Sequence, residues 1–476
     1  MQQHDLSSPA AVHEQIVRLR DFDPSIRRRA VVALGDIGSP FADSAIPPLI
    51  ITLGDRSEYV RHAAVEALVQ FGAPVVPKLV ICLRNAKPAV KCGAADVLGR
   101  IGSPIADAAV PALISCLRDR FNRVREAATV SVGRFEASMV EQAVPELIAC
   151  LNDGSSVVQQ KAAESLGRIG SPFSDAAIQS LITCLRDQSE DVRDAAAESL
   201  VRIGAPAVSE LIACLRHTDI DVRTRAAKSL GRIESPIVDA LVPFLIACLR
   251  DQSDQVRDTA AESLVRIGAL SVPEFVSCLH DVDFGVRRRA AESLGRIGSP
   301  IADAAVPALI TCLGDQHWEV RRRVVKSLSQ IGSPAAAPSV PGLITRLRGD
   351  ADPGVRSSAA EALGRIRSPN PVTTVDALID CLPDPAPGVG QACASTLRSF
   401  RSVAVRALIN KLRDPSADIR EASAFMVSTF GAVAGIAIPH LDDCLHDPVQ
   451  SVRDTAARAI IQIEAATRQG GGGAPQ

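Results

Sequence analysis

Apolar residues recur along this chain with the period of an amphipathic helix, and the stretch Asp187 to Gly204, DQSEDVRDAAAESLVRIG, shows the pattern best. The residues that fall at i, i+4, i+8 and i+11 are Val192, Ala196, Leu200 and Ile203. This spacing places them on one face of a helix and the polar residues on the other. We therefore predict a helix here with one buried and one solvated face.

Close copies of this stretch recur from one end of the chain to the other. Aligning them on the position of Val192, called the anchor residue below, defines repeats 1 to 14, with the anchors Ile26, Val60, Val90, Val124, Val158, Val192, Val222, Val256, Val286, Val320, Val355, Val389, Ile419 and Val452. Seven of the thirteen spacings are 34 residues, four are 30, and the other two are 35 and 33. Such a period predicts one continuous array of stacked helical repeats.

Each repeat contains a second apolar segment before the anchor helix, so we expect two helices per repeat. The first helix is of the type VPALISCLRD, at Val110 to Asp119, and the second often ends at a glycine such as Gly204, where a left-handed cap costs least. In the longer repeats Ser103 and Pro104 are predicted to start the first helix as N-cap and first residue. A further proline in the pattern is predicted to bend that helix, at Pro47, Pro111, Pro243 and Pro307.

Composition narrows the class of protein. Hydrophobic residues make up 47% of the chain and aromatic residues only 3%, which suits close helix packing by small side chains. A net charge of −2 gives no general attraction to nucleic acid or to an anionic membrane. The sequence lacks the apolar run of a signal peptide or a membrane span. We therefore expect a cytoplasmic, monomeric protein without a membrane partner.

Twelve cysteines would suggest disulfides or metal binding, but their register predicts otherwise. Ten lie three residues before the aspartate that opens the anchor stretch: Cys82, Cys116, Cys150, Cys184, Cys214, Cys248, Cys278, Cys312, Cys381 and Cys444. Equivalent residues of stacked repeats lie about 10 Å apart, which is too far for a disulfide. We predict a column of small, buried, free thiols.

An aspartate lies five residues before the anchor in twelve of the fourteen repeats, and an arginine follows the anchor in eleven. These two positions are six residues apart, about 600° around a helix, so they do not share a face within one repeat. We predict a ladder of Asp and Arg side chains between neighbouring repeats, represented by Asp187, Arg193, Asp251, Arg257, Asp281, Arg287, Asp315 and Arg321.

The pattern VPALI-CL-D----VR--AAESLGRIG resembles the HEAT-like repeats first named from phycobilisome pigment lyases, over about residues 9–466. The resemblance implies an all-α fold, a right-handed α-solenoid of about fourteen antiparallel helix pairs, with the second helices lining the concave surface. Proteins of this kind are mainly binding scaffolds, and a minority are enzymes or enzyme partners. These include a di-iron hydroxylase with repeated His-Glu pairs, whereas this chain has one such pair, His13-Glu14.

Catalytic signatures are missing from the sequence. It contains no HExxH, no CxxC, no phosphate-binding glycine loop and no Ser-His-Asp constellation on a suitable scaffold. His440 and His446, near Cys444, allow a metal-site interpretation, but the segment also fits an ordinary first helix. We predict no catalytic residues, no metal and no cofactor.

The polar faces of the second helices carry mixed charge. Six repeats place an acidic residue four positions before an arginine: Asp96 and Arg100, Glu164 and Arg168, Glu198 and Arg202, Glu262 and Arg266, Glu292 and Arg296, Glu361 and Arg365. These pairs either support their own helices or form the floor of a groove for a polar protein surface.

Repeats 9 and 10 break this balance with two arginine triplets. They contribute Arg287, Arg288, Arg289 and Arg296, then Arg321, Arg322, Arg323 and Lys326. The only tryptophan, Trp318, precedes the second triplet, and Trp and Arg are frequent energetic centres of interfaces. Trp318 either marks a contact centre or packs over its own repeat junction. A similar triplet, Arg27 to Arg29, lies in repeat 1.

Three segments depart from the regular array. Residues 368–400 are rich in proline, and Gly390 replaces the ladder arginine, so a hinge or a partner-specific loop is predicted there. Residues 1–8 are predicted to be a flexible tail, and residues 467–476 a disordered, glycine-rich tail.

From these features we predict a non-enzymatic scaffold that binds a protein or peptide partner along its concave surface. Two alternatives stay open at this point. One is an accessory subunit of a lyase or another protein-modifying enzyme, and the other is a nucleic-acid-binding scaffold that uses repeats 9 and 10.

Overall fold

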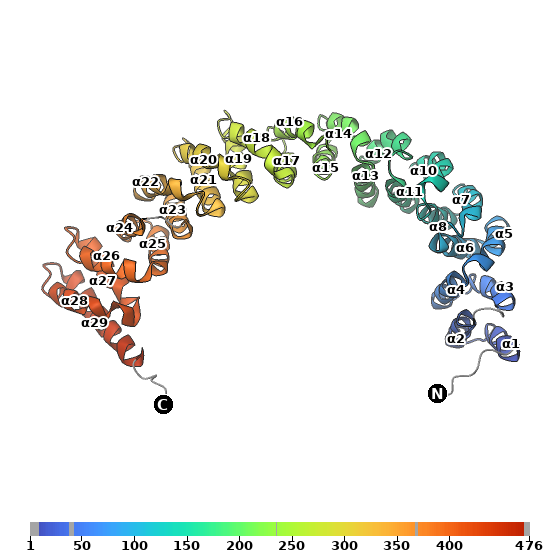
Figure 1. Ribbon diagram of the computed structural model, residues 1–476, viewed down its shortest axis with the longest axis horizontal. Coiled ribbons are helices and arrows are strands. Elements are labelled where there is room, and N and C mark those ends of the chain that lie inside the picture. Colours follow the sequence, from blue (N-terminus) through green and yellow to red (C-terminus); the bar gives the residue numbers. More distant parts are fainter. Residues whose placement is uncertain (1–8, 38–41, 235, 367–369, 471–476) are drawn as a thin grey trace. The chain divides into compact units, whose positions relative to one another are not determined.

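The computed structural model describes residues 9–37, 42–234, 236–366 and 370–470 (Figure 1). Within these residues the chain is all helical, and two helices alternate in each of the fourteen repeats. The predicted fold class, an α-solenoid of stacked helix pairs, is confirmed. The chain divides into two compact units, Met1–Val238 and Asp239–Gln476.

The first compact unit holds repeats 1 to 7. Its first helices are α1 (Pro9–Arg18), α3 (Ala42–Thr52), α5 (Val76–Asn85), α7 (Val110–Cys116), α10 (Val144–Cys150), α12 (Ile178–Cys184) and α14 (Val208–Cys214). Its second helices are α2 (Pro24–Gly35), α4 (Glu58–Phe71), α6 (Pro88–Ile101), α8 (Asn122–Val132), α11 (Ser156–Ile169), α13 (Glu190–Ile203) and α15 (Ile220–Leu230). The short helix α9 (Ala137–Val140) precedes α10.

The second compact unit holds repeats 8 to 14. Its first helices are α16 (Val238–Cys248), α18 (Val272–Cys278), α20 (Val306–Cys312), α22 (Val340–Gly349), α24 (Pro371–Asp380), α26 (Arg401–Lys411) and α28 (Ile438–Cys444). Its second helices are α17 (Asp254–Ile267), α19 (Phe284–Ile297), α21 (Trp318–Ile331), α23 (Pro353–Arg365), α25 (Pro387–Ser399), α27 (Ala417–Ser428) and α29 (Gln450–Gly470).

Short 3-10 helices lead into many of the first helices. They are η1 (Ala73–Val75), η2 (Asp107–Ala109), η3 (Glu141–Ala143), η4 (Asp175–Ala177), η5 (Ala205–Ala207), η6 (Gly268–Ser271), η7 (Asp303–Ala305), η8 (Ala337–Ser339) and η9 (Gly431–Ala437).

Helices of one kind pack against the same kind in the next repeat, as α11 packs on α13 and α19 on α21. The predicted buried face forms the core, with Val192, Ala196 and Leu200 all at 0% exposure. The second helices approach closely because small residues face each other: the Ser199 hydroxyl donates to the Ala163 carbonyl at 2.7 Å. A Cβ on Gly167 would lie only 2.8 Å from Ser199 Cα. This contact fixes the stacking register of α11 and α13.

The cysteine column follows the prediction. All twelve thiols are free, and nine of the ten in the shared register are buried, Cys82 being half-buried. Several point at a leucine carbonyl of the preceding repeat, as Cys116 Sγ does at Leu83 O, 3.6 Å away. Burial and the nearby carboxylate of Asp153 raise the pKa of Cys150 to about 11. These thiols act as small core residues and weak hydrogen-bond donors.

The starts of the longer first helices differ from the prediction. Ser103 and Pro104 lie in a turn before η2, and α7 begins only at Val110. Pro111 therefore occupies the first turn, where the absence of its N–H costs nothing, and it does not bend the helix. Pro307 is likewise in the first turn of α20, whereas Pro47 and Pro243 lie inside α3 and α16.

Within residues 370–400 the chain forms the helices α24 and α25, joined by a turn. The hinge was predicted partly because Gly390 replaces the ladder arginine. A Cβ on Gly390 would lie 2.5 Å from the Leu382 carbonyl oxygen, so glycine permits a close backbone approach here. Lys411 supplies ion pairs instead, at 2.6 Å to Asp380 and 3.2 Å to Asp414. The hinge over 368–400 remains a prediction, and residues 368 and 369 lie outside the described part.

At the end of the chain α29 continues to Gly470, four residues beyond the predicted boundary at 466. The alanines, arginine and glutamine that precede Gly470 are good helix formers, which extends the helix locally. Residues 1–8 and 471–476 lie outside the described part.

No single helix in the described residues has the length and apolar character needed to cross a membrane. The bent pair Glu58–Phe71 and Ala73–Asn85, with 112° between its arms, meets that test together by length and composition only.

Candidate second-helix binding surface

Ion pairs connect the start of seven second helices to the next repeat. Arg287 Nε donates to Asp315 Oδ2 at 2.7 Å, and its Nη1 donates to the Asp281 carbonyl in its own repeat at 2.8 Å. Asp315 also accepts the His317 N–H at 2.8 Å. The same bridge to the next repeat joins Arg27 to Asp55, Lys91 to Asp119, Arg125 to Asp153, Arg321 to Asp350, Arg356 to Asp384 and Arg420 to Asp447.

Burial and charge oppose each other in these pairs. Burial of the Asp315 carboxylate raises its pKa, but the hydrogen bonds from Arg287 and His317 outweigh burial, so the pKa lies below the ordinary 3.8. The Asp315 hydrogen bond raises the pKa of Arg287. Each such pair is ionised and links one repeat to the next.

Asp187 and Arg193, which were predicted to belong to the ladder, make no ion pair with the neighbouring repeats within the described residues. Arg193 Nη1 donates to the Asp187 and Gln188 carbonyls, and its buried Nε has no hydrogen-bond partner within the described residues. The next repeat offers His217 where the ladder needs aspartate, and the preceding repeat offers Gln159 where it needs arginine. The inter-repeat tie predicted for Asp187 and Arg193 is therefore wrong.

Repeats 8 and 9 also differ from the predicted ladder. Arg257 pairs with Asp254 of its own helix and donates to the Asp251 carbonyl, and Asp281 pairs with Arg250. The carboxylate that Arg257 was predicted to reach, that of Asp281, is thus paired with Arg250 in the turn that follows α16.

The two arginine triplets separate into three kinds of contact. Their first members, Arg287 and Arg321, belong to the ladder. Their third members pair with carboxylates of the preceding repeat: Arg289 with Asp258 at 2.9 Å and Asp254 at 2.5 Å, and Arg323 with Glu292 at 3.3 Å. The middle members, Arg288 and Arg322, lie at the surface between α19 and α21.

That surface holds a small depression. Its volume is about 170 Å³, and it is lined by Arg288, Trp318, Glu319, Arg322, Arg323 and Lys326. Arg288 lies 3.7 Å from Glu319, whereas no carboxylate among the described residues lies within 4.0 Å of Arg322 or Lys326. Burial and the neighbouring Arg322 and Arg323 lower the pKa of Lys326. The structure thus gathers four predicted partner-binding residues around one depression.

Trp318 is 42% exposed beside an aromatic stack. The rings of Phe284 and His317 are stacked with centroids 3.9 Å apart, and the His317 and Trp318 rings are 6.4 Å apart. Trp318 therefore contributes both to the repeat junction and to the surface, so the two interpretations of this residue are compatible.

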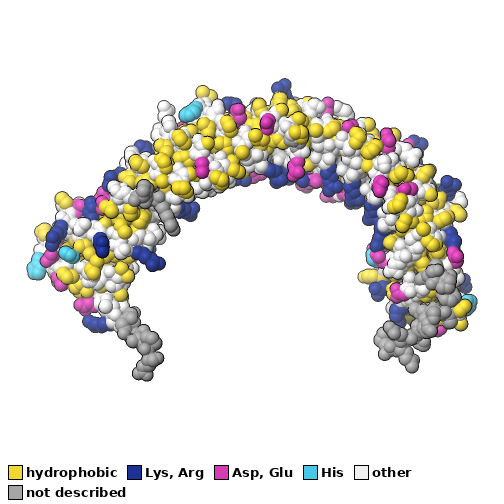
Figure 2. Space-filling view, in the orientation of Figure 1, with side chains coloured by type: hydrophobic (Ala, Val, Ile, Leu, Met, Phe, Trp, Pro, Cys, Tyr) yellow, Lys and Arg dark blue, Asp and Glu magenta, His cyan; other side chains and the backbone are white. Residues whose placement is uncertain are grey.

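The other predicted partner-binding residues lie elsewhere on the second helices. Arg202 is 3.6 Å from Glu198, as helix support requires, but Glu198 also binds Arg232 of the next repeat at 2.7 Å. Similar bridges join Glu66 to Arg100 and Asp96 to Arg134. Glu262 and Arg266 on α17 and Arg296 at the end of α19 are exposed and do not line the depression. In both units acidic and basic side chains are interspersed on the surface (Figure 2).

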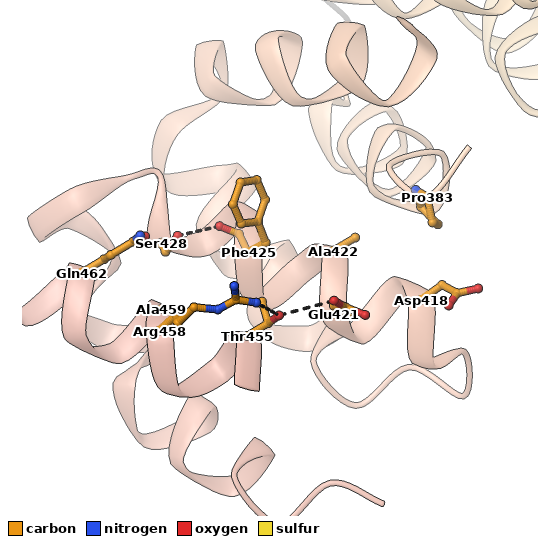
Figure 3. Close-up of a pocket in the computed structure, with 10 residues that line it drawn as sticks. All are labelled: Pro383, Asp418, Glu421, Ala422, Phe425, Ser428, Thr455, Arg458, Ala459 and Gln462. Atoms are coloured by element: carbon orange, nitrogen blue, oxygen red, sulfur yellow. Dashed lines mark hydrogen bonds between the residues drawn. The ribbon is translucent and has the colours of Figure 1, made fainter. Parts of the chain in front are cut away.

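Sequence reasoning missed a larger depression on α27 and α29, of about 600 Å³. Phe425, 60% exposed, projects from α27 into this space, and Glu421, Thr455 and Arg458 line one side of it (Figure 3). Glu421 accepts the Ser451 hydroxyl at 2.7 Å. The available signal was Phe425 itself, because it occupies the position where seven other repeats have Asp or Glu.

In the described residues no three His, Cys, Asp or Glu side chains are placed to hold a metal ion. The second-helix surface carries ion pairs, exposed aromatic rings, and the two cations Arg322 and Lys326, which have no carboxylate partner among the described residues. Such a surface can bind polar and aromatic groups of another molecule.

The chain is similar to known proteins in sequence and in structure. Profiles described as HEAT repeats match residues 14–86, 76–153, 144–213, 208–275, 272–340 and 340–427, and a HEAT repeat profile matches 437–464. No curated protein sequence matches the chain.

Solved structures of solenoids are similar over nearly the whole chain. Kap121p bound to RanGTP matches with 15% identity and a TM-score of 0.55, over 96% of this chain and 56% of that one. Yeast importin-beta, Kap95p, matches with 14% identity and a TM-score of 0.45, over 98% of this chain and 72% of that one.

The chain spans 56%, 50% and 62% of the length of three Kap121p chains that it matches. At these identities the likeness concerns the fold. The profile matches cover most of the sequence, and together with the stacked helix pairs they show that this chain belongs to the HEAT-repeat family.

Proposed function

We propose that this protein is a non-enzymatic scaffold that binds a protein or peptide partner on its second-helix surface, which the family resemblance implies to be concave. The observation that supports the proposal is the depression between α19 and α21, where Trp318 is exposed beside the unpaired cations Arg322 and Lys326. Exposed aromatic rings next to arginine are common centres of protein interfaces.

The fold supports the same function. A solenoid presents a long surface on which each repeat contributes a few side chains, and such surfaces usually bind extended partners. Kap121p, a chain of similar fold, is bound to RanGTP in its crystal structure. We further propose that the protein acts as a monomer in the cytoplasm. A role as accessory subunit of a modifying enzyme, and a kinship with the lyase-type repeats, remain predictions.

Affinity capture from the native cell tests the proposal. The wild-type chain is compared with a Trp318→Ala, Arg322→Ala double variant, and a protein retained by the wild type is expected to be reduced about tenfold or more by the variant. Lys228→Ala serves as the matched control, because Lys228 is an exposed lysine at the position of Lys326 in repeat 7, which contains no tryptophan.

The variants are first compared by circular dichroism, so that a loss of binding is not a loss of fold. Equal capture by the wild type and the double variant would contradict the proposal for this surface. Turnover of a substrate by the purified chain, abolished by one substitution, would contradict the non-enzymatic assignment.

A further inference from the structure

The depression between α19 and α21 has an excess of positive charge that the rest of the fold does not neutralise. Four cations and one carboxylate line it. Arg323 has its partner in Glu292, and Arg288 lies 3.7 Å from Glu319. Arg322 and Lys326 are exposed and have no carboxylate within 4.0 Å among the described residues. A bound anion would therefore find two cations that no internal pair occupies.

Lys326 is a cation at a position where half of the fourteen repeats carry an acidic residue. Seven repeats carry an acidic residue there: Glu66, Asp96, Glu164, Glu198, Glu262, Glu292 and Glu361. In α21 the acid is replaced by Lys326, and the arginine that usually follows four residues later is replaced by Gln330. The middle arginine of the triplet, Arg322, adds a second cation where most repeats have none. The charge of this row is thus reversed beside the only tryptophan.

The aromatic side of the depression adds an apolar contact. The Trp318 ring is partly exposed, and next to it the stacked rings of Phe284 and His317 connect the start of α19 to the start of α21. A rigid indole beside two cations suits a group that combines an apolar body with negative charge next to it.

The volume of the depression argues against a site that encloses a small molecule. A depression of about 170 Å³ is smaller than the roughly 300–1,000 Å³ of sites that enclose small molecules. It has room for one or two side chains of a longer partner. The neighbouring second helices then provide polar surface on either side for the rest of a segment.

Nucleic acid fits the arrangement less well than a peptide. A nucleic-acid site of useful affinity neutralises several phosphates along a track, about 6 to 10 in a typical protein. In the two triplets, Arg287, Arg289, Arg321 and Arg323 are all held by aspartate or glutamate. Two unpaired cations and one indole form a point of contact rather than a track.

Resting on the proposed function, we propose that the depression between α19 and α21 binds an acidic peptide segment, whose carboxylates pair with Arg322 and Lys326 while an adjacent apolar side chain packs on Trp318. The arginine of the middle position offers two parallel N–H donors to one carboxylate, and the lysine offers a single charge to the next. Both are at the surface, so binding weakens as salt rises.

A display library of random peptides tests the proposal directly. The library is selected on the full wild-type chain and counter-selected on the Arg322→Ala, Lys326→Ala double variant. The expected result is enrichment of Asp and Glu next to an aliphatic or aromatic residue. Enrichment of basic or uncharged peptides, or of the same peptides on both baits, would overturn the proposal.

Trp318 reports on binding because it is the only tryptophan in the chain. A selected peptide without tryptophan is titrated into the protein, and a change in Trp318 fluorescence is expected. Affinity should fall about tenfold in the double variant and stay unchanged in Lys228→Ala. A peptide with its acids changed to lysine should give no signal, and an equal signal from it would contradict the proposal.

Two further outcomes separate this inference from the proposed function. If affinity capture yields a partner lost in the Trp318→Ala, Arg322→Ala variant but the peptides selected are not acidic, the scaffold function stands and the acidic peptide is wrong. Tighter binding of a single-stranded DNA oligonucleotide than of any selected peptide, lost in the double variant, would replace the peptide by nucleic acid.

Discussion

Consecutive arginines in α19 and α21 have different roles because each residue turns about 100° around the helix. The first arginine of each triplet meets the turn of the next repeat, the third meets carboxylates of the preceding repeat, and the middle one faces the surface between them. In Arg287 and Asp315 the side chains are 16% and 9% exposed, so this pair is largely shielded from water. Removal of the Arg287 side chain leaves the Asp315 carboxylate buried without its cation.

We predict that Arg287→Ala lowers the free energy of unfolding by about 1.5–3 kcal/mol, the range for hydrogen bonds to a charged group. The reason is the loss of both donors to Asp315, at 2.7 and 3.0 Å. Urea unfolding followed by circular dichroism measures the change, and hydrogen exchange places it on α19 and α21.

Arg193→Ala is the matched control. Arg193 makes the same contacts to the carbonyls of its own turn, but it has no carboxylate of the next repeat. A similar loss in both variants would mean that the ion pair between repeats contributes nothing.

Low pH provides a second test of this ion pair. The pKa of Asp315 is lowered in the fold, so the contribution of Asp315 to stability is present above pH 3.8 and is lost as the pH falls below that value. The difference between wild type and Arg287→Ala should therefore shrink below pH 3.8.

At the scale of the helices, close approach requires small residues at particular positions. The contact of Gly390 with the Leu382 carbonyl brings α25 against the turn that precedes it. Lys411 then bridges Asp380 and Asp414 from α26, in the register that a cysteine fills in most repeats. The segment predicted as a hinge thus has its own packing contact and its own ion pairs.

We predict that Gly390→Ala destabilises the protein by about 1–3 kcal/mol, as expected when an added methyl group forces backbone to move. The measurement is the urea midpoint, with hydrogen exchange over α24 to α26. Gly388→Ala, two residues earlier in α25, is the control, because a Cβ there meets nothing within 4 Å. Alanine should be neutral or stabilising there by up to about 1 kcal/mol. A neutral Gly390→Ala would instead favour the softness predicted from the lost arginine.

At the scale of the whole chain, contacts are made mainly within and between neighbouring repeats. Each of the two compact units contains seven helix pairs with their own buried face. In arrays of this kind, stability is approximately the sum of repeat and interface contributions. Neither half should require distant repeats in order to form its helices.

We predict that residues 1–235 and 236–476, expressed separately, each fold into a helical array. Circular dichroism should show helical spectra and cooperative melting for each fragment. The full-length chain is the control for helix content per residue. A disordered spectrum from either fragment would contradict independent folding of that half.

Several features could be read from the sequence because they depend on local order alone. The period of the anchors predicted the helices, their buried faces and the cysteine column, since 3.6 residues per turn places these side chains on one side. The breaks in the ladder were also readable, because Gln159 and His217 stand where arginine and aspartate are needed. The bend predicted at Pro111 was wrong, because whether a proline bends a helix depends on where that helix begins.

The sequence by itself therefore determined the repeat, its core face and the family of folds, because each follows from a register that every copy shares. Tertiary structure decided which charges remain free. Arg287 and Arg289 are engaged by Asp315, Asp254 and Asp258 of neighbouring repeats, whereas Arg322 and Lys326 are left without a carboxylate. That outcome depends on side chains about thirty residues away, which come within hydrogen-bonding distance only when the helices stack.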